Sequence, residues 1–292
     1  MQGGVNNVAV LITCHNRREL TLQCLEKLFS QKSKHLLTVF LVDDGCTDGT
    51  PQAVSIAWPE VQIVTGSGNL FWNGGMRAAW HAAKTQRDDW DAYLWLNDDV
   101  SLHETALDKA LSELSDLLAN SSDQALILVG PTTDTDGGKA TYGGLTLPKP
   151  RERPLRMVLT EPVGSPSLCD TFSGNFVLIS RRAEQMLGSL REDFIHIYGD
   201  LDYGFRARDL GIPIYQMSDF VGTCSANSSS GSSLDRTLSL FKRLSLRIKE
   251  EKKLHARDWR KFCRLHSKIG PLYFLYSIPP YLRIIATSNR IF

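Results

Sequence analysis

The amino-acid sequence predicts an α/β fold in which helices flank a mostly parallel sheet. Short apolar runs alternate with segments of helical periodicity through the first half of the chain, and polar residues follow those runs directly. A length of 292 residues, 42% hydrophobic and 22% charged, suffices for one large soluble domain with an appendage. Because such sheets bind ligands outside the carboxyl ends of their strands, we expect the functional residues there.

The predicted strands are apolar runs rich in Val, Ile and Leu. They occupy residues 8–13, 36–42, 61–65, 92–96, 125–129, 175–180 and 214–217. The spacing of apolar residues predicts helices over 18–30, 76–85, 103–119, 181–188 and 200–210, and a further helix whose first turn contains Pro51. Residues 66–75 are interpreted as a glycine-rich loop, and residues 132–169 as short hairpins and loops.

The last part of the chain differs in composition. Residues 227–233, rich in Ser and Gly, are interpreted as a linker between a first domain, 1–226, and a helical, basic and aromatic region, 234–292. From Lys242 to the C-terminus there are 13 basic residues (Lys and Arg) and 3 acidic residues (Asp and Glu). The rest of the chain has 20 basic and 29 acidic residues. This surplus favours contact with an anionic membrane surface. A homo-oligomer contact is an equally physical alternative, and nucleic acid is disfavoured because the remaining chain is acidic.

Three features indicate the compartment. The six cysteines are scattered without a C-x-x-C pair, which suits a reducing environment. The N-terminus lacks the basic segment of a signal peptide, and no apolar stretch is long enough to span a bilayer. We therefore expect a cytoplasmic protein, peripheral at the cytoplasmic face of the inner membrane.

The segment 93–100, YLWLNDDV, carries the most specific functional signal. Its apolar part predicts a buried strand, and Asn97, Asp98 and Asp99 follow at the carboxyl end of that strand. Two neighbouring carboxylates repel each other, and a cation relieves this repulsion. The segment therefore predicts a metal and phosphate site at the edge of the sheet.

Polar residues follow three other predicted strands in the same way. They are Thr13, Cys14, His15, Asn16 and Arg17 after the first strand, Asp43 and Asp44 after the second, and Gly68, Asn69, Trp72 and Gly75 in the loop after the third. Taken alone, each group is equally typical of a turn or a helix cap, as Asp43, Asp44 and Asp48 illustrate. Four polar strand ends in successive units favour a shared site instead.

Four motifs together resemble the family 2 glycosyltransferases, which have the GT-A fold. They are the T-C-H-N-R start, the V-D-D-G-C-T-D-G-T loop, the L-N-D-D-V turn and the later G-D-L-D-Y-G-F-R segment. The resemblance covers roughly residues 8–225. The G-N-L-F-W-N-G-G loop is similar to the rhamnosyltransferase-like branch of bacterial enzymes that build O-antigen and other surface polysaccharides.

The resemblance implies a role for each strand-end position. Asp43 would hydrogen-bond the pyrimidine base of the donor, Asp99 would bind the Mg²⁺ or Mn²⁺ that bridges the diphosphate, and Asp98 would lie over the sugar or ribose. The other implied nucleotide-sugar contacts are Thr13, His15, Asn16, Arg17, Asp44, Gly68, Asn69, Trp72, Gly75 and Asn97. One or two carboxylates together with substrate phosphates commonly hold such a hard cation.

The segment 199–206 would supply the catalytic base. In the resemblance, Asp200 deprotonates the acceptor hydroxyl in a transfer with inversion, and Asp202 and Arg206 look like a supporting ion pair at i and i+4. Asp200 is also a typical helix N-cap residue, which is the structural alternative.

Two functions are consistent with this pattern. The first is an inverting glycosyltransferase that moves a sugar from dTDP-rhamnose or a UDP-sugar to a hydroxyl of a glycan or polyprenyl-linked glycan. The second is a catalytically inactive nucleotide- or carbohydrate-binding protein of the same fold. Three departures from the family keep it open: Gly199 replaces a Glu, Arg77 stands where many members have Asn, and residues 220–225 lack a His found in many members.

Two other enzyme classes are disfavoured by the segment after the first strand. A nucleotidyltransferase would have a glycine-rich phosphate loop there, and a dinucleotide-dependent oxidoreductase would have G-x-G-x-x-G. The T-C-H-N-R segment contains no glycine.

Overall fold

The computed structural model describes residues 5–31, 35–147, 157–226, 229–249, 256–267 and 270–287. The strands of its central sheet are β1 (Asn7–Cys14), β2 (Leu36–Asp43), β3 (Gln62–Thr65), β4 (Ala92–Leu96), β6 (Ile127–Val129), β11 (Ser167–Cys169), β13 (Phe176–Ser180) and β14 (Ile214–Gln216). The helices around it are α1 (Arg18–Phe29), α2 (Thr50–Ala57), α3 (Phe71–Gln86), α4 (Ala106–Ala119), α5 (Arg181–Leu187) and α6 (Gly199–Asp209).

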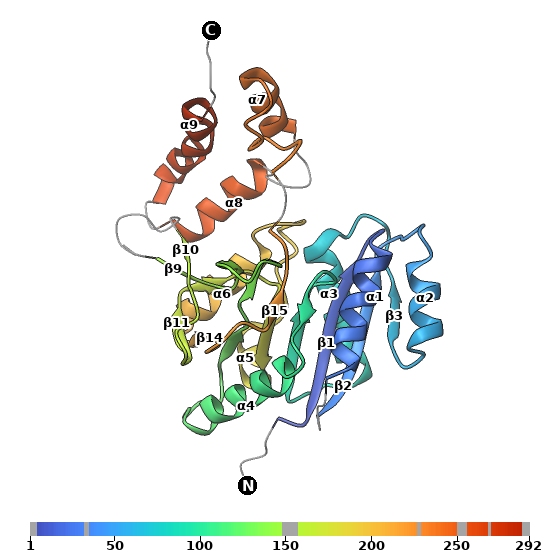
Figure 1. Cartoon of the computed structure of the whole chain (residues 1–292). Helices are drawn as coiled ribbons and strands as arrows, with labels where there is room; N and C mark the ends of the chain where they lie inside the picture. The colour runs from blue at the N-terminus through green and yellow to red at the C-terminus, as the bar shows by residue number, and fades with distance from the viewer. Residues whose placement is uncertain are drawn as a thin grey trace.

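The central sheet has eight strands in the order β11-β14-β6-β13-β4-β1-β2-β3 (Figure 1). Neighbours among β4, β1, β2 and β3 run parallel, as do β6 and β14. By contrast, β13 runs antiparallel to β4 and β6, and β11 antiparallel to β14. A mostly parallel sheet between helices confirms the predicted fold class.

Two small sheets accompany the central one. One contains β5 (Ser101–Leu102), β15 (Gly222–Thr223), β7 (Thr132–Thr133) and β8 (Ala140–Tyr142), and the other contains β10 (Val158–Leu159), β9 (Gly144–Thr146) and β12 (Thr171–Phe172). Strands β7, β8, β9 and β10 agree with the hairpins and loops predicted for residues 132–169, of which residues 148–156 lie outside the described residues.

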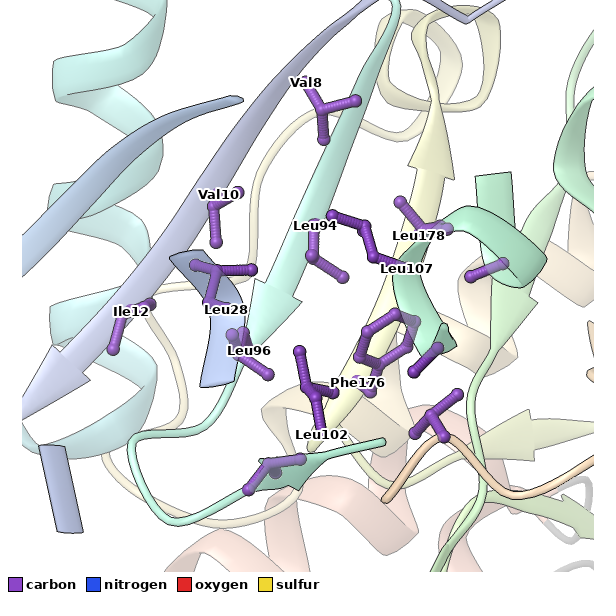
Figure 2. Packing of buried hydrophobic residues seen from close by; sticks show 14 of the residues in the cluster. Val8, Val10, Ile12, Leu28, Leu94, Leu96, Leu102, Leu107, Phe176 and Leu178 are labelled. Carbon is purple, nitrogen blue, oxygen red and sulfur yellow. The ribbon is translucent and has the colours of Figure 1, made fainter. Parts of the chain in front are cut away.

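The central sheet buries both of its faces, so successive residues of a strand enter two different cores. On one face, Val10 of β1 and Leu94 of β4 pack with residues of α1 and α4 (Figure 2). On the other face, Leu11 and Trp95 pack with α3, α5 and α6. The continuous apolar runs of the sequence arise from this double coverage.

The register of the parallel strands brings their polar ends to one edge. Cys14 at the end of β1 pairs with Asp43 at the end of β2, and Leu11 pairs with Trp95 near the end of β4. Because β13 is antiparallel to β4, its first residue, Phe176, pairs with Leu96 and also lies at this edge. The loops that follow β1, β2 and β4 and the loop that precedes β13 therefore meet.

The start of α3 differs from the prediction. The helix begins at Phe71, inside the segment interpreted as a loop, rather than at residue 76. The backbone N–H groups of Leu70 and Phe71 donate to the Asp44 carboxylate at 2.9 and 3.0 Å, which satisfies free donors at the helix start. A cap supplied by a distant strand end leaves no local signal in the helix sequence.

The C-terminal helices are α7 (Leu240–Lys249), α8 (Ala256–His266), the 3-10 helix η1 (Gly270–Ser277) and α9 (Pro279–Ala286). They lie beyond α6, at the end of the molecule opposite the N-terminus (Figure 1). The Pro279-Pro280 pair begins α9, because the first turn of a helix needs no N–H from proline. Residues 227–228, 250–255 and 268–269 of this region lie outside the described residues. None of the described helices is both long and apolar enough to cross a membrane.

Candidate active site

A cavity of about 670 Å³ opens at the edge of the sheet where the parallel strands end. Eleven of the fourteen predicted site residues line it: Thr13, His15, Arg17, Asp44, Gly68, Asn69, Trp72, Asn97, Asp98, Asp99 and Asp200. The three others, Asn16, Asp43 and Gly75, are not among its lining residues. The structure thus brings together segments that the sequence linked only by their position after strands.

Asp44 fixes the glycine-rich loop to the end of β2. It is buried, and its carboxylate accepts hydrogen bonds from the backbone N–H groups of Gly68, Leu70 and Phe71. The loop passes so close that a Cβ on Gly45 would lie 2.8 Å from the Cα of Gly68. Asp44 therefore shapes the backbone that lines the cavity.

The three predicted residues outside the lining have other contacts. Asn16 accepts a hydrogen bond from the backbone N–H of Thr47 at 2.7 Å, which joins the loops after β1 and β2. Asp43 accepts one from the backbone N–H of Cys46 at 2.7 Å, inside its own turn. Gly75 lets α3 approach β1, because a Cβ there would lie 2.1 Å from a side-chain oxygen of β1.

A single guanidinium bridges the acidic pair after β4. Arg17 Nη1 lies 3.0 Å from Asp98 Oδ1, and Arg17 Nη2 lies 2.6 Å from Asp99 Oδ2. Burial raises the pKa of Asp98 to about 7, with the charge of Asp99 adding to the increase and Arg17 opposing it. Asp99 is the more exposed of the two carboxylates, and Arg17 is 40% exposed. The outer side of the pair can therefore be reached once Arg17 moves.

Cys224 lies beside the acidic pair, in the loop where many relatives were expected to have His. Its Sγ is 3.5 Å from Asp99 Oδ1, and the side-chain amide of Asn175 donates to the same sulfur at 3.5 Å. Burial, followed by the charge of Asp99, raises the pKa of this thiol to about 12. At neutral pH the group at this position is a neutral thiol.

Trp72 connects the acidic pair to the opposite wall of the cavity. Its indole N–H donates to the side-chain oxygen of Asn97 at 2.7 Å. Its ring passes over Gly174, where a Cβ would come within 2.6 Å of the ring and 3.3 Å of the Asp200 Cβ. Gly174 therefore allows Trp72 and Asp200 to lie side by side.

Asp200 lies in the first turn of α6 and points its carboxylate at two backbone donors. Oδ2 accepts from the N–H of Gly174 at 3.0 Å, and Oδ1 accepts from the N–H of Leu201 at 2.8 Å. Burial raises the pKa of Asp200 above its ordinary value, although the two N–H groups oppose this rise. A carboxyl group with a raised pKa beside a cavity has the properties of a general base.

A side chain at Gly199 would displace the buried side chain of Asn73. A Cβ on this residue would lie 2.0 Å from the side-chain oxygen of Asn73 in α3. Asn73 is buried, and its amide donates to the backbone oxygens of Arg191 and Phe194 at 2.8 and 2.7 Å. The departure from the family pattern thus results from close packing of α3 against the segment that leads into α6.

Asp202, two residues beyond Asp200, anchors α6 to other parts of the chain. It is fully buried, and its Oδ2 accepts from Arg206 Nε at 3.0 Å and lies 3.3 Å from Arg191 Nε. Its Oδ1 lies 2.9 Å from His266 Nε2 in α8. The predicted pair with Arg206 is present, and a C-terminal helix completes the network.

Aromatic side chains continue the contact between α8 and the cavity wall. Phe262 of α8 is fully buried and stacks on Tyr198 at 5.2 Å between ring centroids. Tyr198 lines the cavity next to Asp200 and has a φ of 72°, which is rare for a residue other than glycine. Phe194 and Phe205 pack against the same ring of Phe262. The C-terminal helices therefore support the wall that carries Asp200.

The cavity also includes residues that were not among the fourteen predicted site residues. They are Cys14, Phe71, Tyr142, Leu145, Ser173, Gly174, Asn175, His196, Ile197, Tyr198 and Leu201. Residues 173–175 precede β13, and the search for loops after strands overlooked them because β13 runs antiparallel to β4. Tyr142 and Leu145 come from the short strands β8 and β9.

These observations define a class: an α/β protein with a ligand cavity and an acidic pair at the carboxyl edge of its sheet. Within that class, the chain belongs to glycosyl transferase family 2, because the model of that family matches residues 9–178. The match ends within β13, so α6 and the C-terminal helices lie beyond it. A sequence search among curated proteins finds no match.

Solved glycosyltransferase structures share the GT-A fold at low identity. TarS 1–349 of S. aureus in complex with UDP-GlcNAc aligns with a TM-score of 0.58 and 12% identity over 96% of this chain and 72% of its own. The mannosyltransferase PcManGT from Pyrobaculum calidifontis, in complex with GDP-Man and Mn²⁺, aligns with a TM-score of 0.53 and 15% identity. The alignment covers 96% of this chain and 74% of PcManGT. GalNAc-T7 with UDP, GalNAc and Mn²⁺ aligns with a TM-score of 0.53 and 12% identity. The alignment covers 73% of this chain and 43% of the GalNAc-T7 chain.

The acidic pair fits a cation that is shared with substrate phosphates. No three His, Cys, Asp or Glu side chains converge as metal ligands within the described residues. A hard cation that takes one or two carboxylates, phosphate oxygens and water needs no such cluster. Asp99 is the more exposed carboxylate, and Asp98 lies beside it. The Arg17 guanidinium forms ion pairs with one oxygen of each, at the position where a cation would bind.

Proposed function

We propose that this protein is an inverting glycosyltransferase that uses a nucleotide-diphosphate sugar. The observation that carries the proposal is the arrangement around Trp72, which bonds to Asn97 beside the acidic pair and lies against Gly174 beside Asp200. The residues proposed to bind the donor and the proposed base line one cavity. Membership in glycosyl transferase family 2 and the nucleotide sugars bound in the TarS and PcManGT structures support the same function.

The donor would occupy the side of the cavity formed by the strand ends. Asp44 holds the Gly68–Phe71 backbone against the cavity, and His15 is fixed there by a 2.6 Å hydrogen bond between Nδ1 and the backbone oxygen of Asp44. Arg17 has both guanidinium nitrogens at the acidic pair and could bind a phosphate when the donor enters. In this proposal Asp43 reaches the base of the nucleotide after a rearrangement of its turn.

Mg²⁺ or Mn²⁺ would be held by Asp99, with Asp98 beside it. When bound, the ion would neutralise charge on the departing diphosphate. The residues of the chain contribute the rest: the neighbouring carboxylates attract the ion, and Arg17 exchanges its ion pairs for contacts with phosphate. The Mn²⁺ in two of the compared structures supports a divalent ion in this role.

Asp200 would accept the proton of the acceptor hydroxyl. As the oxygen bonds to the anomeric carbon, the bond from that carbon to the diphosphate oxygen breaks, and the configuration inverts because attack comes from the opposite face. The N–H groups of Gly174 and Leu201 hold the carboxylate in place. Burial and the raised pKa favour proton uptake by Asp200.

We propose dTDP-rhamnose as the first donor to test and UDP-sugars as the second. The acceptor would be a hydroxyl of a glycan or polyprenyl-linked glycan in bacterial surface-polysaccharide assembly. The support is the G-N-L-F-W-N-G-G loop, whose Trp72 lies between the acidic pair and Asp200, where a donor sugar would sit.

The first test is thermal stabilisation by dTDP, UDP and GDP, each with and without Mn²⁺. A ligand that binds the native state raises the melting temperature by mass action. We expect dTDP or UDP to raise it and Mn²⁺ to increase the rise. If no nucleotide stabilises the protein at concentrations far above a micromolar dissociation constant, the nucleotide-site assignment is wrong.

The alternative is a nucleotide- or carbohydrate-binding protein without transferase activity. Close packing of Gly199 against Asn73, in place of the Glu of the family, is the observation that favours it. Sugar release from dTDP-rhamnose or UDP-sugars in the presence of mixed glycan acceptors separates the two functions. Nucleotide binding without turnover of any donor would support the alternative.

A further inference from the structure

Helix α7 has the reverse of the usual distribution of side chains. Arg243 and Arg247, four residues apart, are 1% and 3% exposed. Phe241 and Ile248, seven residues apart and therefore on one side of the helix, are 83% and 69% exposed. In water, a helix normally exposes its guanidinium groups and buries its aromatic and branched residues.

The buried arginines hold α7 against the rest of the C-terminal helices, and this contact fixes the direction of the exposed side. Arg243 donates to the backbone oxygens of Ser233 and Ile284 at 3.1 and 3.3 Å and to the Thr287 hydroxyl at 2.9 Å. The Arg247 guanidinium lies 6.0 Å from the ring centroid of Tyr281 in α9. The apolar side of α7 therefore faces outward because of specific contacts on its opposite side.

Exposed apolar residues continue onto the neighbouring elements. Leu272 and Phe274 of η1 are each 51% exposed, and Leu282 and Ile285 of α9 are 56% and 41% exposed. Helices α7 and α9 lie next to each other (Figure 1). We call the exposed side of α7, with the side chains of Phe241 and Ile248, the apolar face, and the exposed residues of η1 and α9 add apolar side chains at the same end of the molecule. Exposed apolar residues grouped in this way mark an interaction surface.

Among the described residues of the C-terminal region, the exposed charged side chains are all cationic. Lys242 and Lys249 on α7 and Arg283 on α9 are exposed. Among the described residues from 229 onward, the carboxylates are Asp235 and Asp258, and both are buried. Within this described part, exposed cations flank the apolar side chains and no carboxylate is exposed. This arrangement is complementary to a surface that has an apolar interior and anionic groups above it.

We propose that the apolar face docks on an anionic lipid bilayer. Phe241 and Ile248 would enter the region between headgroups and acyl chains, and Lys242 and Lys249 would lie among the lipid phosphates. A second copy of this chain is a poorer occupant because its own exposed cations would face those of the first. A nucleic acid is poorer because it offers no apolar surface to the centre of the face.

The contact would bring the cavity close to the membrane. Helix α7 packs against α9, α9 against η1, and η1 against α8, whose Phe262 stacks on Tyr198 in the cavity wall. A lipid-linked acceptor at the bilayer surface would then lie within reach of this wall. The docking itself requires no nucleotide, so it can be tested whether or not the proposed transferase activity is found.

The experiment is co-sedimentation of the full chain with vesicles of phosphatidylcholine, with and without phosphatidylglycerol. We expect binding to the mixed vesicles, weakened by salt, and little binding to phosphatidylcholine alone. The double substitution Phe241→Ser and Ile248→Ser should reduce the partition coefficient by about tenfold or more. The double substitution Lys242→Gln and Lys249→Gln should reduce the preference for phosphatidylglycerol.

Ile56→Ser supplies a matched control, because Ile56 is 84% exposed on α2 in the part of the chain matched by the family model. It should bind vesicles as the parent does, and an equal loss in this variant would overturn the proposal. So would absence of binding to both kinds of vesicle. Ultracentrifugation without lipid gives a further check: if the parent is a dimer and the Phe241 and Ile248 variant a monomer, a second copy covers the face instead.

Discussion

The two long walls of the cavity are built in different ways. The wall with Asp44 and Asp98 comes from consecutive units of the parallel sheet, and each residue directly follows a strand. The wall with Asp200 combines the start of α6 with residues 173–175 and rests on α8 from the end of the chain. The first wall depends on local order in the sequence, whereas the second depends on contacts between distant segments.

The carboxylates of the two walls also differ in their surroundings. Asp44 accepts hydrogen bonds from three backbone N–H groups and organises a loop. Asp200 accepts from two, and burial raises its pKa above the ordinary value. The comparison indicates that Asp44 mainly maintains structure and Asp200 is suited to proton transfer.

The largest expected effect is that of Asp200→Asn. This substitution keeps the size of the side chain but removes the proposed base, so kcat should fall by about 10²–10⁴-fold, as is usual for loss of a general base. Thermal stabilisation by dTDP or UDP should remain as in the parent, because the wall with Asp44 and Asp98, here called the strand-end wall, is unchanged. A variant that retains full kcat would show that Asp200 serves only to hold the backbone N–H groups of Gly174 and Leu201.

The next effect concerns the support of the Asp200 wall by α8. Phe262→Ala removes a fully buried ring and should lower the free energy of unfolding by about 3–5 kcal/mol. Phe241→Ala on the exposed side of α7 is the matched control and should change it by less than about 0.5 kcal/mol. Denaturant titration measures both values. Equal effects of the two substitutions would mean that α8 does not pack on the cavity wall.

A smaller effect distinguishes two neighbours on the strand-end wall. Asp44→Ala removes the acceptor of the partly buried N–H groups of Gly68, Leu70 and Phe71, and should lower the free energy of unfolding by about 1–3 kcal/mol in total, because water can reach these groups. Asp43→Ala removes one partly buried hydrogen bond and should lower the free energy of unfolding by about 0.5–1 kcal/mol. Denaturant titrations of both variants provide the comparison, and a larger loss for Asp43→Ala would contradict it.

The sequence was informative where function depends on the residues directly after a strand. Apolar runs predicted the strands because both faces of the sheet are buried, and the register then brought Asp44, Asn97 and Asp98 to one edge. The same reasoning included Gly75, which instead serves packing against β1, since a motif does not reveal which way a residue faces. A position directly after a strand therefore predicts that a residue lies near the cavity, but it does not predict that its side chain lines the cavity.

The other wall could not be predicted because its parts have no shared local pattern. Ser173 precedes an antiparallel strand, and nothing in the sequence gives that direction. His266 lies 64 residues beyond Asp202, so their contact depends on how α8 packs against α6. The basic composition of the C-terminal region concealed that two of its arginines are buried.

The last prediction concerns the pH dependence of kcat and of nucleotide binding, which should differ because each depends on a carboxylate of a different wall. Protonation of Asp200 removes the base, so kcat should fall as pH decreases through its pKa, by about tenfold per unit below it. Because burial raises this pKa, the fall should begin at a higher pH than for an ordinary aspartate. Asp98, with a pKa raised to about 7, lies on the nucleotide side, and its protonation should alter stabilisation by dTDP rather than kcat at saturating donor. Measuring kcat and nucleotide stabilisation over the same pH range distinguishes them, and a kcat that tracks nucleotide binding at every pH would assign the titration to the strand-end wall alone.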